Sequence, residues 1–175
     1  MLRSSLFLVL LMMVACDSST DDLAGLIGTQ NVPLMVTSAT VADGHISVES
    51  QLTPATFLTR VETELDRDVT HVDLLNVTLS LPTPNSPPWS ALFGATMTVS
   101  LVPDSTGAAL AVASATPPAD NSDVAAKVSV SRATLDQFPD IAAGRFKVRL
   151  SGDAAGDIAS DVSQAVLVRL ELSAF

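Results

Sequence analysis

The sequence predicts an all-β protein, an Ig-like antiparallel β-sandwich of about seven or eight strands with one or two short helices. From Pro33 onward, short runs of Val, Leu, Ile and Thr are divided by turn residues about every ten residues, a spacing typical of a sandwich or barrel. Within several runs, apolar and polar residues alternate, as in a strand with one buried face. The hydrophobic content of 47% is spread over these runs. We therefore expect one β domain over residues 33–175.

Two local signals place individual strands within this pattern. Asp43-Gly44 divides the first two strands and predicts a hairpin, because both central residues of the favoured turn adopt positive φ. Val72 and Leu74 have the opposite parity to Val77, so we expect a β-bulge near Leu75. The predicted strands cover residues 34–41, 45–52, 72–81, 95–102, 110–114, 124–131, 145–151 and 163–175.

Two short helical segments interrupt the strands. Thr53-Pro54 is a suitable helix start, with threonine as N-cap and proline at the first helical position. An edge strand is the alternative for this segment. Residues 134–143 are expected to form one or two helical turns, weakened by Pro139 and closed by Gly144. The apolar face of the first helix is formed by Phe57, Leu58, Val61 and Leu65.

Residues 1–15 have the organisation of a secretory signal peptide. Arg3 is followed by an apolar run from Leu6 to Val14, and Ala15 is a small residue at the end of the run. A transmembrane helix needs roughly 20 apolar residues, so this shorter run predicts a cleaved leader.

The leader ends in Met13-Val14-Ala15-Cys16, which resembles the lipobox of bacterial lipoproteins. The resemblance implies that Cys16 receives a diacylglyceryl group with acyl chains such as palmitate and becomes the first residue after cleavage. Cys16 is the only cysteine, so it can form no disulfide within the chain. The alternative is an ordinary signal peptide with an incidental cysteine. On the lipobox interpretation, residues 16–32 form a flexible tether.

These observations predict a location and exclude one class of partner. A lipid on Cys16 would anchor the domain to a bacterial membrane of the cell envelope, facing the periplasm or the cell surface. The chain has 19 acidic and 9 basic residues and a formal net charge of −10. Such a surface repels phosphate backbones, so we expect no nucleic acid partner. An envelope protein is a possible partner.

Two features are candidates for partner contact. Arg145, Lys147 and Arg149 lie on one face of a predicted strand and could bind an anion or an acidic partner. The alternative is cross-strand pairing with carboxylates such as Glu171. Trp89 could contact a partner, but the alternative is that it fills one end of the core, because its large apolar area favours burial.

The sequence offers little for catalysis or metal binding. His71 and Asp73 would project to one side of a strand like a base and its orienting carboxylate, yet there is no Gly-x-Ser-x-Gly nucleophile motif. Neither His45 nor His71 has a second ligand at transition-metal spacing. Oxygen ligands for calcium occur in two loops but do not match an EF-hand and are expected to be solvated turns. These loop residues are Asp120 and Asp123, and Asp153, Asp157 and Asp161.

The sequence therefore predicts a membrane-anchored envelope lipoprotein with a non-catalytic binding or structural domain. No catalytic residue, metal or cofactor is expected. One alternative is a carrier of a small apolar ligand or lipid. The other alternative is a hydrolase around His71.

Overall fold

The structure is a computed structural model that describes residues 26–51, 56–66, 68–82, 86–156, 158 and 160–175. The predicted signal peptide, Cys16, the first part of the tether and Asp157 lie outside the described residues. The strands are β1 (Leu26–Thr37), β2 (Val41–Ala42), β3 (His45–Glu49), β4 (Val72–Ser80), β5 (Phe93–Pro103), β6 (Leu110–Ala115), β7 (Val124–Val128), β8 (Phe146–Ala154) and β9 (Ser163–Ala174). The helices are α1 (Thr56–Leu65), α2 (Trp89–Leu92), α3 (Arg132–Leu135) and α4 (Pro139–Ala142), with a 3-10 turn η1 (Ser38–Thr40).

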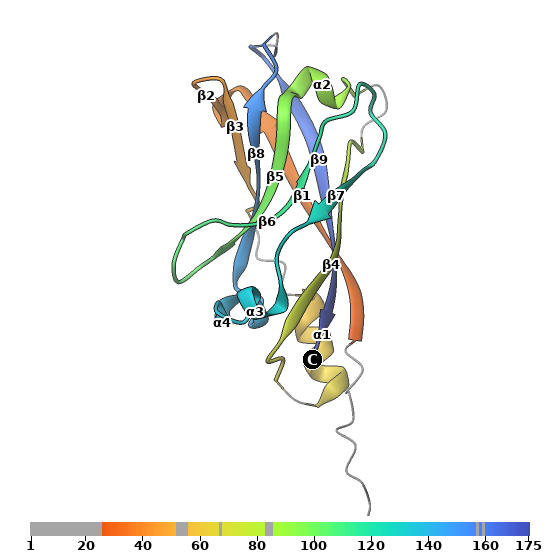
Figure 1. Ribbon diagram of the computed structural model, residues 1–175, viewed down its shortest axis with the longest axis vertical. Coiled ribbons are helices and arrows are strands. Elements are labelled where there is room, and N and C mark those ends of the chain that lie inside the picture. Colours follow the sequence, from red (N-terminus) through yellow and green to blue (C-terminus); the bar gives the residue numbers. More distant parts are fainter. Residues whose placement is uncertain (1–25, 52–55, 67, 83–85, 157, 159) are drawn as a thin grey trace, which may run out of the picture.

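The strands form one curled, nine-stranded antiparallel sheet in the order β1-β9-β4-β7-β6-β5-β8-β3-β2 (Figure 1). β7 joins the two halves of the sheet, since its first residues pair with β4 and its last residues pair with β6. The curl brings β1 and β3 from opposite ends of the strand order close to each other. The predicted all-β, antiparallel fold is confirmed.

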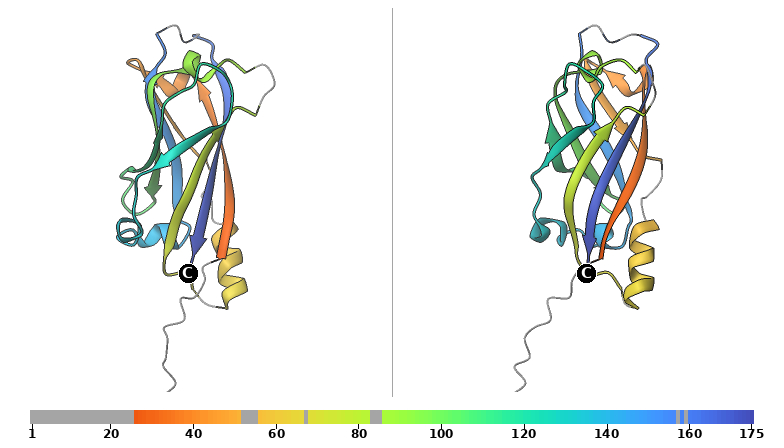
Figure 2. Two further views of the ribbon diagram at one scale, coloured as in Figure 1. Left: turned by 45° about the vertical axis from the view of Figure 1, so that its right-hand side comes forward. Right: turned by 90° about the vertical axis from the view of Figure 1, so that its right-hand side faces the viewer.

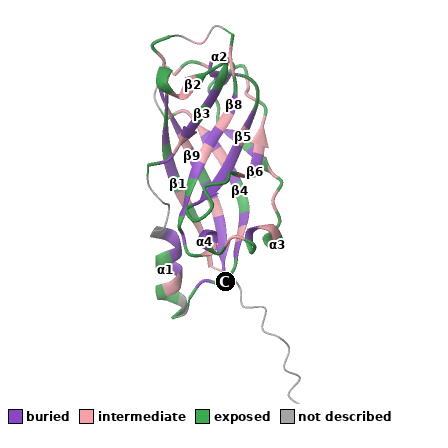
Figure 3. Cartoon of the chain, turned by 90° about the vertical axis from the view of Figure 1, so that its left-hand side faces the viewer, coloured by how far each residue is buried: buried purple, intermediate pink, exposed green. Residues whose placement is uncertain are grey.

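One apolar core lies between the two halves of the curled sheet. The predicted inward parities of β8 and β9 are confirmed, because buried positions alternate with intermediate or exposed ones along most of both strands (Figure 3). Alternation buries one face of each strand and leaves the other to solvent. The largest fully buried side chains include Trp89, Phe93, Phe146, Ile46, Leu79, Met97, Leu101, Leu150 and Leu170.

Helix α1 packs beside the lower end of β1, near the C-terminal end of β9 (Figure 2). Its apolar face is buried at Phe57, Leu58 and Val61, as the spacing predicts. The proposed helix start at Thr53-Pro54 lies outside the described residues. Within the described chain, no helix combines the length and the apolar character needed to cross a bilayer.

Two predicted backbone features are confirmed. Asp43 and Gly44 have φ values of 52° and 74° and connect β2 to β3. The β4–β9 register shifts between Leu74 and Asn76, which places the bulge at Leu75. Both features follow from local residue types, which explains why the sequence alone identified them.

Several predicted boundaries are wrong. β1 begins at Leu26, so the last residues of the predicted tether, 26–32, are strand and the domain begins before Pro33. Residues 26–32 form a strand because β9 pairs with β1 along its whole length. The predicted strand 34–41 breaks at η1 before β2. The helical segment 134–143 is divided into α3 and α4, because Pro139 occupies the first turn of a new helix.

Candidate functional site

A groove of about 600 Å³ lies between β1 and β3. Its exposed surface is mostly apolar. It is lined by Gln30, Asn31, Val32, Pro33, Leu34, Met35, Thr37, Thr40, Ser47, Val48, Glu49, Ser50, Gln51 and Ala165. A volume of this size falls in the range of about 300–1,000 Å³ that is typical of small-molecule sites.

The groove exists because the curled sheet leaves two strand edges facing each other. β1 pairs with β9 on one side only, and β3 is paired to β2 only at His45 and Ile46. In an antiparallel pair, successive residues direct their backbone groups to opposite sides. The Thr37 N–H donates to Thr40 Oγ1 (3.0 Å) and therefore points away from β9. Because β1 pairs with β9 without a bulge, the other odd-numbered residues of β1 also direct their N–H and C=O groups away from β9. Pro33 lies on this free edge, where its missing N–H removes no ladder bond.

The floor of the groove is formed by core side chains. Val32, Leu34 and Val48 are only 2%, 4% and 5% exposed. Met35 is 48% exposed and is one of three large apolar side chains in the described chain that face solvent. Ala165, opposite Met35 on β9, completes the apolar wall. The floor side chains are therefore already packed in the core, and Met35 and Ala165 supply more of the accessible apolar surface.

Cations on the neighbouring strands β8 and β9 contact two of the lining residues, Glu49 and Asn31. On one side, Arg149 Nε donates to Glu49 Oε1 (2.8 Å), and Lys147 Nζ lies 3.9 Å from Glu49 Oε2. On the other side, Arg169 Nε donates to Asn31 Oδ1 (3.4 Å). Among the described residues that line the groove, Glu49 is the only charged one. Two cations therefore contact the Glu49 carboxylate, and Arg169 contacts Asn31 on the other strand.

The predicted cationic stripe is divided between two places. Lys147 and Arg149 both contact Glu49, whereas Arg145, just before β8, pairs with Asp140 (2.7 Å). Pairing with carboxylates is thus observed, although with Glu49 and Asp140 rather than Glu171, which accepts a hydrogen bond from Asn76 (2.6 Å). Hydrogen bonds from Ser105, and then from Arg145, lower the pKa of Asp140 to about 2.

Trp89 is 0% exposed, so it has no surface to offer a partner. Its Nε1 donates to the Ser122 carbonyl (2.9 Å), and its backbone N–H donates to the Asp120 carbonyl (3.0 Å). The partner-contact interpretation of Trp89 is wrong, and the core interpretation is confirmed. The physical reason is that the 120–122 loop closes over the indole.

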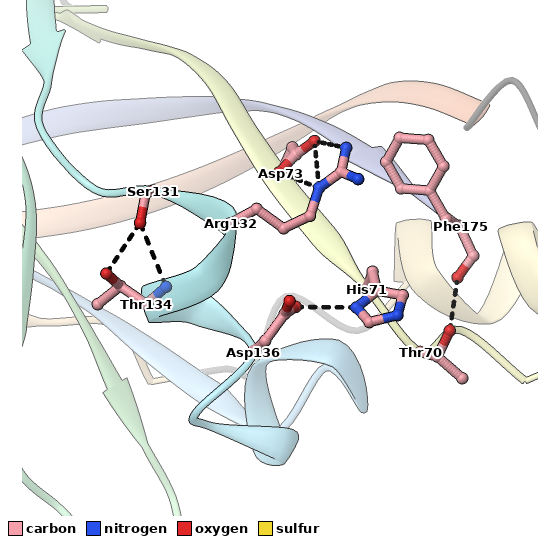
Figure 4. A network of polar contacts seen from close by, with 8 residues as sticks. All are labelled: Thr70, His71, Asp73, Ser131, Arg132, Thr134, Asp136 and Phe175. Carbon is pink, nitrogen blue, oxygen red and sulfur yellow. Dashed lines mark hydrogen bonds and ion pairs between the residues drawn. The ribbon is translucent and has the colours of Figure 1, made fainter. Parts of the chain in front are cut away.

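His71 does not pair with Asp73. Its Nδ1 lies 3.0 Å from Asp136 Oδ1, whereas Asp73 accepts hydrogen bonds from Arg132 (Figure 4). Arg132 also stacks over the Phe175 ring at 4.4 Å. The nearby Ser131 hydroxyl caps α3 at the Thr134 N–H (3.3 Å). The network in Figure 4 thus connects α3 to β4 and to Phe175. Among the residues drawn there, no hydroxyl is bonded to His71.

The acidic loops are engaged in turn contacts. Asp120 Oδ1 accepts hydrogen bonds from the Ser122 hydroxyl (2.6 Å) and backbone N–H (3.2 Å), which lower the pKa of Asp120. The Nδ1 atom of His45 lies 3.5 Å from Oδ1 of Asp153. Over the described ranges, no three His, Cys, Asp or Glu side chains are grouped so that they could hold a metal ion.

Sequence reasoning missed most of the groove. It assigned Asn31 to the tether and identified neither Met35 nor Ala165 as a site residue. The available signal was Pro33 inside the uncharged run 26–37, because proline within a strand indicates a free edge. The identity of the opposite edge depends on a long-range curl that no local pattern reveals.

No protein-family model and no curated protein sequence matches this chain. Among solved structures, a chain from Desmodium yellow mottle tymovirus is similar at 16% sequence identity and a TM-score of 0.27. The similarity covers 87% of this chain and 91% of that chain. A likeness this low carries no argument about fold or function.

Proposed function

We propose that this protein is a lipid-anchored binding module of the bacterial cell envelope and that it has no catalytic role. Cys16 is its acylated first residue, and its ligand binds in the groove between β1 and β3. The observation that carries the binding role is the groove itself, a mostly apolar hollow of about 600 Å³ between β1 and β3. An apolar carrier function is thereby favoured over a purely structural role.

We also propose that the curled sheet is an Ig-like sandwich in its finer architecture. Two features support this assignment. The two halves of the sheet enclose a single core, and they are joined through β7, which pairs with both β4 and β6. The groove would then be the open seam of the sandwich, opposite β7 in the strand order.

A hydrolase around His71 is less well supported. His71 is exposed and pairs with Asp136, and the closest cluster of polar groups serves α3 and Phe175. A nucleophile must lie within hydrogen-bond reach of its base. The described contacts of His71 include no serine or threonine hydroxyl.

The anchor is tested by intact-mass analysis of the protein made in a bacterial host. We expect a mature chain that begins at Cys16 and carries the mass of a diacylglyceryl group. Cys16→Ser should lose this mass, whereas the control Ser18→Ala should retain it. A mature chain with a free thiol at Cys16, or one that begins elsewhere, contradicts the anchor.

The groove is tested with a small, neutral, photoreactive aryl diazirine added to the membrane-bound full chain. We expect mass spectrometry to locate the label on residues 30–37 and 47–51. Ala165→Phe adds an aromatic ring to the groove wall and should remove this label. Ala125→Phe makes the same change at an exposed position of β7 and should not. Labelling unaffected by Ala165→Phe contradicts the groove as a binding site.

A further inference from the structure

We propose that Met35 is a site of oxidative modification, and that oxidation of its thioether to a sulfoxide makes the accessible wall of the groove between β1 and β3 polar. The oxidant is hydrogen peroxide or another peroxide. The effect on binding rests on the proposed function, whereas the modification itself does not. Three observations support the inference: the exposure of Met35, the small size of its neighbour across the sheet, and its contrast with Met97.

Met35 is open to solvent because it lies on a strand at the end of the sheet order. Its side chain is 48% exposed. On one side its neighbour is Ala165 of β9, whose methyl group is too short to cover a thioether. On the other side Met35 lines the groove. The Ser163 hydroxyl donates to Met35 Sδ (3.9 Å), and Ser163 is itself exposed, so the sulfur lies at the surface.

Met97 provides the contrast within the same chain. The sequence has five methionines, and three of them lie in the predicted leader. Removal of the leader therefore leaves Met35 and Met97. Met97 is 0% exposed and belongs to the core. A buried group reacts with a solute only when the structure opens around it. A peroxide should therefore modify Met35 and spare Met97.

The reaction adds one oxygen atom to the sulfur of Met35. The sulfur lone pair attacks one oxygen of hydrogen peroxide, so an S–O bond forms and the O–O bond breaks. The other oxygen leaves with both hydrogens as water, the sulfur is oxidised by two electrons, and the peroxide is reduced. The Ser163 hydroxyl lies beside the sulfur and can donate to the new oxygen, which accepts hydrogen bonds better than a thioether does.

The modification changes the part of the groove that a ligand can reach. The floor side chains Val32, Leu34 and Val48 are only 2–5% exposed, whereas Met35 is accessible. An apolar ligand that covers a sulfoxide oxygen must remove it from water, which costs free energy. Oxidation should therefore weaken binding of an apolar ligand. The effect is reversible, because methionine sulfoxide reductases restore the thioether.

The modification site is tested by treating the membrane-bound full chain with hydrogen peroxide and mapping its peptides by mass spectrometry over time. We expect Met35 to gain one oxygen atom at least about ten-fold faster than Met97, because Met97 reacts only through opening of the core. In urea the two residues should react at similar rates, which shows that the fold protects Met97. Similar rates in the folded protein overturn the assignment.

The effect on binding is tested with the neutral aryl diazirine on the same protein. After peroxide treatment, labelling of residues 30–37 and 47–51 should fall about three- to ten-fold, because the probe would cover a polar oxygen. Methionine sulfoxide reductases of both stereospecificities, with dithiothreitol, should restore it. Met35→Leu cannot form a sulfoxide, so its labelling should not fall relative to its own untreated sample. Untreated Met35→Gln, which is polar, should label as weakly as the oxidised wild type.

The outcomes separate this inference from the proposed function. If Met35 is oxidised but labelling does not change, the effect on binding is wrong and the binding groove stands. If peroxide lowers labelling equally in Met35→Leu, the effect arises elsewhere in the chain and the inference is also wrong. If the probe does not label the untreated protein, the proposed function is wrong and the effect on binding falls with it, whereas the peptide mapping still decides the modification of Met35.

Discussion

Gly28 of β1 lies directly against the ring of Phe57 of α1. A Cβ atom built at Gly28 would lie 2.0 Å from Phe57 Cε2, so any larger residue would force the Phe57 ring or the helix to move. Phe57 is 4% exposed. This contact holds α1 against the lower end of the curled sheet.

Gly28→Ala should therefore displace Phe57 and destabilise the protein. We expect a loss of about 1–3 kcal/mol in the free energy of unfolding, as for other overpacked cores. Urea unfolding followed by far-UV circular dichroism measures this loss. The control is Gly156→Ala, where a Cβ atom meets nothing within 4 Å. Equal stability of the two variants would contradict the close contact between Gly28 and Phe57.

Trp89 should be a main contributor to stability at the other end of the core. Trp89→Ala removes a fully buried indole and should lower the free energy of unfolding by about 3–5 kcal/mol. Trp89→Phe retains a ring but leaves the Ser122 carbonyl without its donor, which costs about 1–3 kcal/mol. Thermal unfolding of both variants tests this order. A Trp89→Ala variant as stable as wild type excludes the core role.

Asp140 should make stability depend on acidic pH. Its pKa is lowered from 3.8 to about 2 in the folded protein by Ser105 and Arg145. A carboxyl with a lower pKa in the folded state stabilises it fully above its unfolded pKa of 3.8. This contribution disappears as the pH falls through about 2.

The measurement is the free energy of unfolding at several pH values across this range. Asp140→Asn cannot titrate, so its stability should change less than that of wild type. Arg145→Gln removes one of the two partners and should move the loss of stability toward higher pH. Parallel pH profiles for wild type and Asp140→Asn would show that this carboxyl is not responsible.

Arg132 should hold the end of the chain in place. It donates to both Asp73 oxygens (2.8 and 2.9 Å) and stacks over Phe175 (Figure 4). Arg132→Ala should cost about 1 kcal/mol, since the pair is partly exposed. It should also speed hydrogen exchange of the Phe175 amide, which donates to the His71 carbonyl. Arg132→Lys should restore little of the lost stability, because lysine lacks the planar guanidinium that donates to both carboxylate oxygens and stacks on the ring.

Local patterns predicted the strands well and the site poorly. Alternation identified the buried faces of β4, β8 and β9, because a period of two depends only on neighbouring residues. Asp43-Gly44 and the bulge at Leu75 are local for the same reason. The start of β1 at Leu26 was missed, because residues 26–32 are strand only through pairing with β9. The partners of Lys147 and Arg149 were missed because Glu49 is far away in the chain.

By itself, the sequence determined the all-β class, the inward faces of the strands, the acidic surface and the expectation of a lipid anchor at Cys16. Each of these depends on composition, alternation or a short motif. Only the tertiary structure decided that β1 and β3 face each other across a groove, that Trp89 is core and that His71 pairs with Asp136. These relationships join residues distant in the chain, and they arise from how the sheet curls around its core.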